Sequence, residues 1–146
     1  MRISTKGRYG LRALLDLAIN SNGSQVSLLS IAQRQNISVN YLEQVFSLLR
    51  KAGLVNSVKG ASGGYMLVEN PSQITVGDIL RTLEGDLMVV DEDTDSGCDS
   101  NGMQQCIKRN VWDKFNKSID GIANTISIAD LVDNYKSQDS GLMFYI

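Results

Sequence analysis

Polar side chains spaced three and four residues apart are the feature of this sequence best suited to molecular recognition. On a helix this spacing places them on one face, and this polar stripe consists of Asn40, Glu43, Gln44, Ser47 and Lys51. Asparagine and glutamine form paired hydrogen bonds with the edge of adenine, and a carboxylate accepts a hydrogen bond from the amino group of cytosine. The stripe therefore predicts reading of base edges in the major groove of DNA. The alternative is an ordinary solvent-exposed helix face.

The composition excludes the most familiar catalytic designs. The 146-residue chain contains no histidine and two cysteines. It cannot form a Ser-His-Asp or Cys-His nucleophile pair, and two thiolates cannot by themselves complete a four-cysteine zinc site. We therefore expect a protein that is not an enzyme. No stretch reaches the ~18 uninterrupted apolar residues of a membrane span, and the amino terminus lacks the apolar segment of an export signal, so a cytoplasmic location is expected.

Charge is divided unequally along the chain. Residues 1–66 hold eight basic and two acidic side chains, a net charge of +6, and the remainder carries −8. A concentrated positive charge attracts polyanions, because nucleic acid releases condensed counterions when a cationic surface binds it. Phosphates would repel Glu43, so its place in the basic half indicates base reading or discrimination against other sequences. For the charge alone, a solvated basic face is the alternative.

The polar stripe lies on the second helix of an expected helix-turn-helix motif. A first helix, capped by residues 4–5, is expected to end near Asn20. A short helix over Leu28–Gln35 follows, and Ser38 is the predicted cap of a third helix that ends near Ala52. Two short helices joined by so few residues predict a helix-turn-helix, which would bring the polar stripe to the duplex.

A glycine-rich segment between two strand patterns follows this motif directly. The strands are expected over residues 54–58 and 65–68, which predicts a β-hairpin. A phosphate-binding P-loop would open a helix rather than a strand, so nucleotide binding is not expected. The hairpin is interpreted as a wing. Gly60 and Gly63 would let its backbone approach a duplex closely, and Lys59 could reach a phosphate or the minor groove.

The expected DNA-binding surface combines base readers with contacts to the phosphate backbone. Its predicted members are Arg2, Arg8, Ser38, Asn40, Tyr41, Glu43, Gln44, Arg50, Lys59, Gly60 and Gly63. The arginines and the lysine are expected to hold the phosphates. The residues of the third helix are expected to read bases or flanking phosphates.

A long amphipathic helix is expected over residues 103–124, about 33 Å at about 1.5 Å per residue. Its apolar positions are Ile107, Val111, Phe115, Ile119 and Ile122. The small body before it cannot cover this stripe, so we expect a homodimer in which the helix of a second copy does. The alternative is an arm that folds back on its own domain. A two-fold dimer would place two reading heads on half-sites of a palindromic operator about 34 Å apart, or a multiple of that distance.

The expected fold class is mainly α-helical with a small β-hairpin wing, a winged helix-turn-helix domain followed by a long dimerisation helix. A last short helix is expected from Ile128 to about Tyr135. The expected parts are the DNA-binding domain (1–85), an acidic loop with a possible ligand or cluster site (86–102), the dimerisation helix with the short helix after it (103–136), and a C-terminal tail (137–146).

Sequence motifs in five segments resemble those of a known family. The matching segments are residues 2–10, 41–44, 49–55, 59–65 and 75–80. The chain resembles the winged-helix repressor family typified by the iron–sulfur cluster regulator (IscR) and the cysteine metabolism regulator (CymR). This resemblance covers nearly the whole chain and implies a dimeric DNA-binding regulator. It also implies base reading on the third helix and minor-groove contact at the wing, where Lys59 stands at a position often held by arginine.

The resemblance raises the question of an iron–sulfur cluster, because cluster-binding members carry three cysteines. Cys106 matches the last of them and Cys98 the middle one, whereas Asp91 and Glu92 stand where the first would fall. Arg109 occupies the place of a histidine found in some members. We expect no cofactor. The alternatives are a cluster held by both cysteines with carboxylates, or a thiol redox switch.

The last residues resemble the end of the cysteine metabolism regulator, which in that group pairs with cysteine synthase. Phe144, Tyr145 and Ile146 would form an apolar tail with a free carboxylate that a partner enzyme could capture. The alternative is that the aromatic rings pack on the dimer. The resemblance thus implies a repressor of cysteine, sulfur or iron–sulfur cluster genes. Its rival is a protein-interaction module that docks its tail into cysteine synthase.

Overall fold

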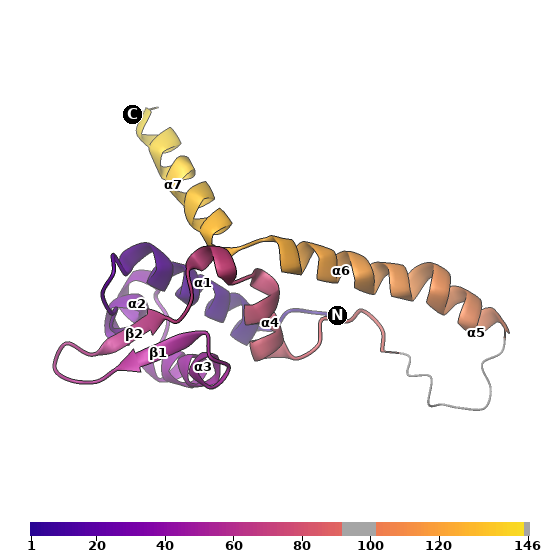
Figure 1. Ribbon diagram of the computed structural model, residues 1–146, viewed down its shortest axis with the longest axis horizontal. Helices are drawn as coiled ribbons and strands as arrows, with labels where there is room; N and C mark the ends of the chain where they lie inside the picture. Colours follow the sequence, from indigo (N-terminus) through magenta and orange to yellow (C-terminus); the bar gives the residue numbers. More distant parts are fainter. Residues whose placement is uncertain (92–101, 145–146) are drawn as a thin grey trace.

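The computed structural model describes residues 1–91 and 102–144, and describes side chains as far as residue 138. Its elements are α1 (Thr5–Asn20), α2 (Leu28–Gln35), α3 (Val39–Lys51), β1 (Val55–Val58), β2 (Gly64–Leu67), the 3-10 helix η1 (Pro71–Gln73), α4 (Val76–Glu84), α5 (Gly102–Ile107), the π-helical η3 (Lys108–Trp112), α6 (Asp113–Thr125) and α7 (Ile128–Phe144). Figure 1 shows a helical body with one small hairpin and two projecting helical segments. The expected fold class is confirmed.

Side-chain caps define where α2 and α3 begin. The hydroxyl oxygen of Ser27 accepts a hydrogen bond from the backbone N–H of Ser30, and that of Ser38 accepts one from the N–H of Tyr41. Between the helices, Asn36 adopts a left-handed backbone conformation with φ of 56°, which asparagine tolerates better than most residues. The expected helix-turn-helix is therefore present.

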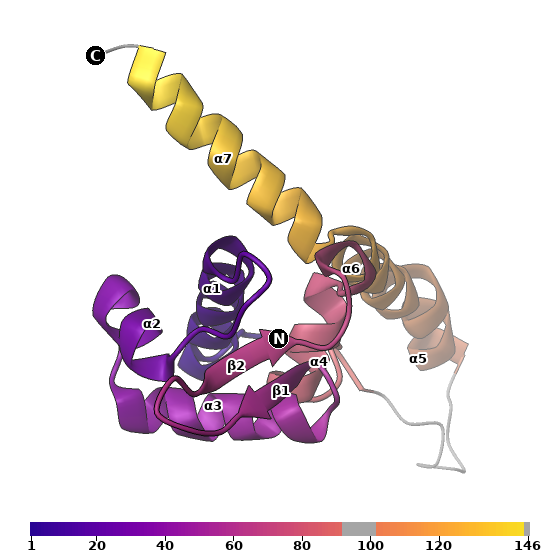
Figure 2. The same ribbon diagram turned by 60° about the vertical axis from the view of Figure 1, so that its left-hand side comes forward.

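The core lies where the first four helices meet the hairpin, as Figure 2 shows from the side. Phe46 of α3 is fully buried, and its ring packs against Tyr65 of β2 with 5.0 Å between centroids. Away from the hairpin, Gly10 of α1 allows this helix to cross α4 closely. A Cβ at that position would lie 2.2 Å from Cδ1 of Leu83. These contacts hold α3 against the body on one side and leave its other side exposed.

The carboxyl group of Glu84 caps the N-terminus of α1. Its Oε1 accepts hydrogen bonds from the N–H of Ser4 at 3.0 Å, from the N–H of Gly7 at 2.9 Å, and from the Ser4 hydroxyl. Ser4 stands at the N-cap position, but its side chain makes no cap hydrogen bond. The expected cap at residues 4–5 is therefore correct in its position, since Ser4 is the N-cap residue, and wrong in its acceptor, which comes from the end of α4.

Elements α5, η3 and α6 form one continuous helical arm from Gly102 to Thr125 that extends away from the body (Figure 1). This confirms the long helix expected over residues 103–124. The expected end of the last helix near Tyr135 is wrong, because α7 continues to Phe144. A glycine inside a helix costs about 1 kcal/mol relative to alanine, so Gly141 does not have to end it.

Among the described residues, no helix combines the length and the apolar character that crossing a lipid bilayer requires.

Candidate nucleic-acid interface

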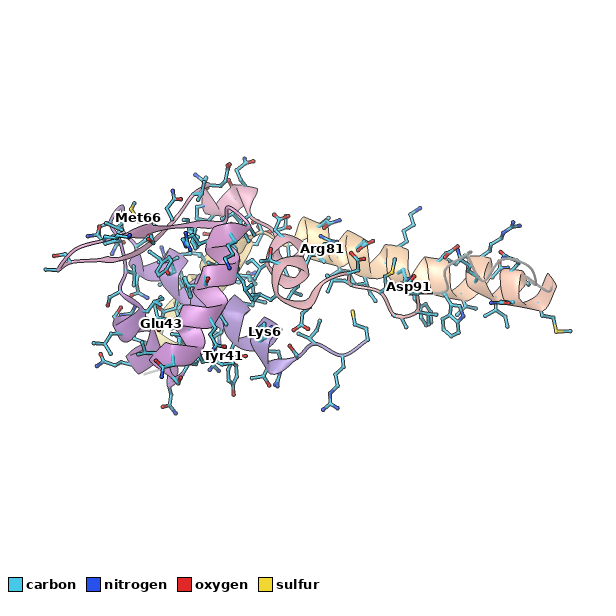
Figure 3. All side chains as sticks on the ribbon, turned by 90° about the horizontal axis from the view of Figure 1, so that it is seen from below. Lys6, Tyr41, Glu43, Met66, Arg81 and Asp91 are labelled. Carbon is cyan, nitrogen blue, oxygen red and sulfur yellow. The ribbon has the colours of Figure 1, made fainter. Side chains whose placement is uncertain are left out.

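The outward face of α3 presents the predicted base readers. Asn40, Glu43 and Gln44 are exposed. The opposite side of the helix is buried in the core through Leu42, Val45, Phe46 and Leu49. Because packing fixes one side of α3, the polar side has a set direction toward solvent. In Figure 3, Glu43 and Tyr41 lie on α3, and Lys6 of α1 lies beside Tyr41.

Aromatic contacts fix Tyr41 at the edge of this face. Its ring packs edge-on against Tyr9 of α1, with 6.1 Å between centroids, and the guanidinium of Arg12 lies 4.8 Å from the centroid of the Tyr9 ring. Arg12 also donates a hydrogen bond of 3.2 Å to the backbone oxygen of Gln35 at the end of α2. This row of contacts links the three helices around the predicted reading face and restricts how they can move relative to one another.

Lys6 is a residue of this surface that sequence reasoning missed. It lines a cavity of about 290 Å³ between α1 and α3, together with Tyr41, Gln44, Val45, Ser47 and Leu48. An ammonium group at the rim of this cavity is suited to a phosphate next to a base that Gln44 could read. In the sequence, a role for Lys6 in binding phosphate is indicated by its position between Arg2 and Arg8 in the basic amino-terminal segment.

The other predicted phosphate-binding residues of the helical part are all exposed. Arg2 precedes α1, Arg8 lies in its first turns and Arg50 in the last turn of α3. Arg8 donates a hydrogen bond to Thr5 at 3.2 Å, which leaves the rest of its guanidinium available. The Ser38 hydroxyl uses its oxygen to cap α3, so its proton can still be donated outward.

The wing is a short antiparallel hairpin in which Ser57 pairs with Tyr65 and Val58 with Gly64. Lys59 is exposed directly after β1. Gly60 has φ of 120°, a conformation that favours glycine. A Cβ on Gly63 would lie 2.7 Å from the backbone oxygen of Val58. Both glycines are thus required by the shape of the tip itself, and their close approach to a duplex stays a prediction.

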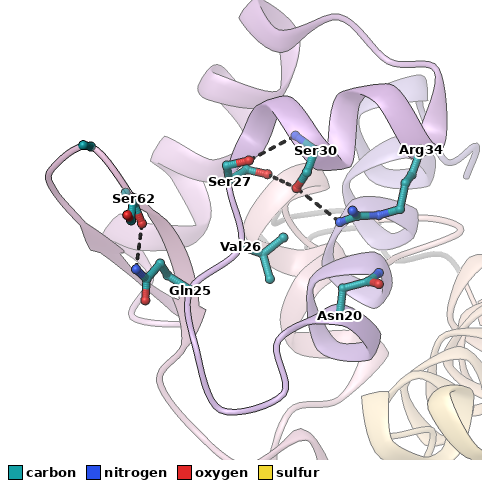
Figure 4. Close-up of a pocket in the computed structure, with 9 residues that line it drawn as sticks. Asn20, Gln25, Val26, Ser27, Ser30, Arg34 and Ser62 are labelled. Atoms are coloured by element: carbon teal, nitrogen blue, oxygen red, sulfur yellow. Dashed lines mark hydrogen bonds between the residues drawn. The ribbon is translucent and has the colours of Figure 1, made fainter.

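The wing is also fastened to the body from its other side. Val26 and Tyr65 exchange two backbone hydrogen bonds, of 3.0 and 2.9 Å. The Gln25 amide donates to the backbone oxygen of Ser62 at 2.6 Å, across a cavity of about 480 Å³ between the start of α2 and the wing tip (Figure 4). The position of the wing is therefore tied to α2.

Arg34 is a basic residue whose charge serves the fold. Its guanidinium donates to the carboxylate of Asp16, with the shortest contact at 2.8 Å, and this hydrogen bond raises the pKa of Arg34 above its ordinary value. Asp16 is 4% exposed and also accepts a hydrogen bond from Gln35. The cluster ties α1 to α2, so Arg34 contributes less to a cationic surface than its charge suggests.

The described residues do not make up an iron–sulfur cluster site. Cys106 is exposed, and its Sγ lies 3.6 Å from the amide nitrogen of Asn110. Cys98 and Glu92 lie outside the described residues, which include Asp91 and Arg109. Among the side chains described, those of residues 1–91 and 102–138, no three histidine, cysteine, aspartate or glutamate residues are grouped so that they could hold a metal ion. One thiolate is too few for a cluster, which usually has four protein ligands.

The predicted tail is described in part. Phe144 is the last residue of α7, and nothing is described of its side chain. Tyr145 and Ile146 lie outside the described residues.

Known proteins are similar to this chain in sequence and in the arrangement of their elements. Residues 3–134 match the Rrf2 family, described as an iron-dependent transcriptional regulator. The chain is 39% identical over 139 residues to the HTH-type transcriptional regulator IscR of Escherichia coli O1:K1 / APEC. These aligned residues make up 95% of this chain and 85% of that protein.

Solved structures of transcriptional regulators are similar to this chain as well. CymR (YrzC), the global cysteine regulator of B. subtilis, is similar with a TM-score of 0.78 and 40% identity, over 92% of this chain and 98% of that one. IscR of T. potens is similar with a TM-score of 0.74 and 44% identity, over 92% of this chain and 88% of that one. These relatives are transcriptional regulators and not enzymes, as expected for this chain. The chain belongs to the Rrf2 family of DNA-binding transcriptional regulators.

Proposed function

We propose that this chain is a cytoplasmic homodimeric repressor that binds palindromic operators of genes for cysteine and sulfur metabolism or iron–sulfur cluster assembly. The observation that carries the proposal is the exposed polar face of α3, held by a fully buried opposite face and flanked by Lys6. The names of the relatives support the class of genes, because they include a global cysteine regulator and IscR proteins. The location follows from the work of a transcriptional regulator, which takes place where the DNA is.

In this proposal α3 enters the major groove. Asn40, Glu43 and Gln44 read base edges, and the Ser38 hydroxyl donates to a flanking phosphate. Lys6 and the exposed arginines hold the backbone, and Lys59 of the wing reaches the minor groove or an adjacent phosphate. Because the carboxylate of Glu43 is repelled by phosphates, it disfavours binding wherever no cytosine amino group is in reach.

The exposed apolar side chains of the arm are the evidence for the proposed dimer. In one copy of the chain, Phe115 is 51% and Ile122 62% exposed. Trp112 packs edge-on against Phe115, with 6.0 Å between centroids, and extends the apolar face. On a helix, Val111, Phe115 and Ile122 share one face. The arm of a second copy, carrying the same stripe, would cover it in a two-fold arrangement.

The test uses the full chain and randomised duplexes. Repeated selection for bound duplexes should enrich a palindrome, and fluorescence anisotropy should show that it binds far more tightly than random competitor. The affinity should fall as salt rises, because phosphate contacts release counterions. A bound pool with no enriched sequence, or a monomer in sedimentation at the concentrations that bind DNA, would contradict the proposal.

We propose further that the regulator works without a resident iron–sulfur cluster. Two cysteines in the whole chain, one of them exposed on the arm, support this. Anaerobic purification followed by visible absorption and iron analysis tests it. A brown protein with about two irons per chain, the content of a two-iron cluster, would contradict it.

A second proposal concerns the tail, which would bind cysteine synthase. It is supported by α7, which projects from the body and carries residues 137–144 outward (Figure 2). Calorimetry with acetylserine sulfhydrylase compares the whole chain with a chain that lacks Ile146. Loss of binding on truncation supports tail capture, and equal affinities exclude it.

A further inference from the structure

A forked hydrogen-bond pair joins the DNA-binding body to the arm. Nη1 of Arg81, on α4, donates to Oδ1 of Asn124 at 2.7 Å, and Nη2 donates to Oδ1 of Asp120 at 2.9 Å. Asp120 and Asn124 are four residues apart on α6, so they lie one turn apart on the same face. One planar guanidinium thus holds two successive turns of the arm.

Close backbone packing reinforces this joint. A Cβ on Gly77 would lie 2.6 Å from Oδ1 of Asn124 and 3.1 Å from the backbone oxygen of Ala123. Ala123 is 6% exposed. The two helices therefore approach too closely for a larger residue at position 77, and the arm cannot settle deeper against α4.

Backbone hydrogen bonds hold the end of the arm. The N–H of Val76 donates to the backbone oxygen of Ile126 at 2.9 Å, and the N–H of Ile128 donates to that of Ile74 at 2.9 Å. These bonds fix the point at which the arm leaves the body. The Arg81 fork lies along α6 from this point and opposes rotation about it.

Exposure shows that Arg81 matters for geometry more than for stability. Its side chain is 32% exposed and that of Asp120 is 52% exposed. Ion pairs this accessible to water contribute little to the free energy of unfolding. A fixed fork on two acceptors nevertheless restricts both sliding and rotation, because a guanidinium is planar and its donors have set directions.

The length of the arm amplifies any change in its angle. From Gly102 to Thr125 it is about 36 Å long at about 1.5 Å per residue. A tilt of about 10° at the joint would move the far end by about 6 Å, close to the rise of two base pairs at about 3.4 Å each. In a dimer joined through the arms, the joint angle therefore determines how far apart the two reading helices stand.

We propose that Arg81 is a positioning residue that sets the half-site spacing the dimer accepts. The inference rests on the proposed homodimeric operator binding. Arg81 acts through Asp120 and Asn124 on the direction of the arm and does not have to contact DNA. Without the Arg81 side chain, the dimer should accept other distances between the two half-sites more readily, while each subunit still recognises its half-site.

The experiment uses the full chain and its selected operator with the centre lengthened or shortened in single base-pair steps. The parent chain should prefer one spacing. Arg81→Gln should reduce the ratio between the best and the neighbouring spacings by about fivefold, the lower end of the effect of one altered base-pair position. Arg81→Lys keeps the charge without the fork and should give an intermediate ratio. Asn124→Ala removes one acceptor and should act in the same direction.

Lys136→Gln is the matched control, because it also removes one positive charge and Lys136 is exposed on α7. It should keep the parent profile. An unchanged spacing ratio in Arg81→Gln, an equal loss at every spacing, or a similar change in Lys136→Gln would each overturn the inference while operator binding by the parent still stands. A parent chain with no preferred operator would count against the proposed function itself.

Discussion

The carboxylate of Asp16, buried in α1, is held by the guanidinium of Arg34 from α2, with the shortest nitrogen–oxygen contact at 2.8 Å. This pair and Gln35 set the angle of α2 against α1. Ser27, the N-cap residue of α2, directly follows Val26, which pairs with Tyr65 of the wing. The pair between Asp16 and Arg34 therefore also fixes the helix to which the wing is attached.

Arg34→Ala should lower the free energy of unfolding by about 1–3 kcal/mol, because the buried carboxylate of Asp16 loses its charged hydrogen-bond donor. The loss is smaller than for a fully buried pair, since the Arg34 side chain is 39% exposed and water screens its charge. Urea denaturation measures this change. The raised pKa of Arg34 means that its stabilising contribution is present throughout the neutral range and is lost only in strong alkali. Arg12→Ala serves as a control, since that arginine makes a backbone hydrogen bond and no ion pair with any side chain that the structure describes. An equal loss in both variants would contradict the assigned role.

Glu84→Ala should destabilise the chain by about 1–2 kcal/mol, the usual effect of removing an N-terminal helix cap. Thermal unfolding gives this number. Glu84→Gln retains an acceptor oxygen and should recover much of the loss. If Glu84→Gln is as unstable as Glu84→Ala, the carboxylate charge rather than the cap geometry stabilises α1.

Gln44→Ala should weaken operator binding by about 1–3 kcal/mol and relax preference at one base pair, because it removes a base-reading amide. Lys59→Ala should instead weaken all sequences alike and reduce the salt dependence. Anisotropy titrations on the selected operator, its single-base variants and random duplex separate the two patterns. A base-specific loss in Lys59→Ala, or a uniform one in Gln44→Ala, would reverse the roles.

Phe115→Glu should shift the protein toward monomers, because it places a charge in the apolar stripe of the arm. Sedimentation equilibrium measures the change in dimer affinity, expected to be at least about 100-fold for a central aromatic residue of an interface. Lys117→Glu places a carboxylate on the far side of the same helix and should leave the dimer intact. A dimer unaffected by Phe115→Glu would show that the arm is not the interface.

Local signals in the sequence predicted much of the body. The caps at Ser27 and Ser38 act within three residues, so they correctly predicted where α2 and α3 begin. The buried and exposed sides of α3 followed from its 3.6-residue period. The hairpin followed from glycines between two short strand patterns. These features could be predicted because each depends on neighbours in the chain.

Contacts between distant residues could not be predicted in the same way. The Glu84 cap joins positions 80 residues apart, and the Arg81 fork joins positions 39 and 43 residues apart. No periodicity marks such partners. Lys6 entered the candidate interface for the same reason, since folding brings it beside Gln44. The end of α7 was predicted wrongly because serine and glycine near residue 140 usually terminate helices, and here they do not.

Pairing of Val26 with Tyr65 gives β2 a neighbour on each side, because β1 covers its other edge. An unpaired strand edge is a template on which another chain can add a strand and begin to aggregate. At Tyr65 the inner strand of the exposed hairpin is thus paired on both edges, which disfavours the addition of a foreign strand at this point.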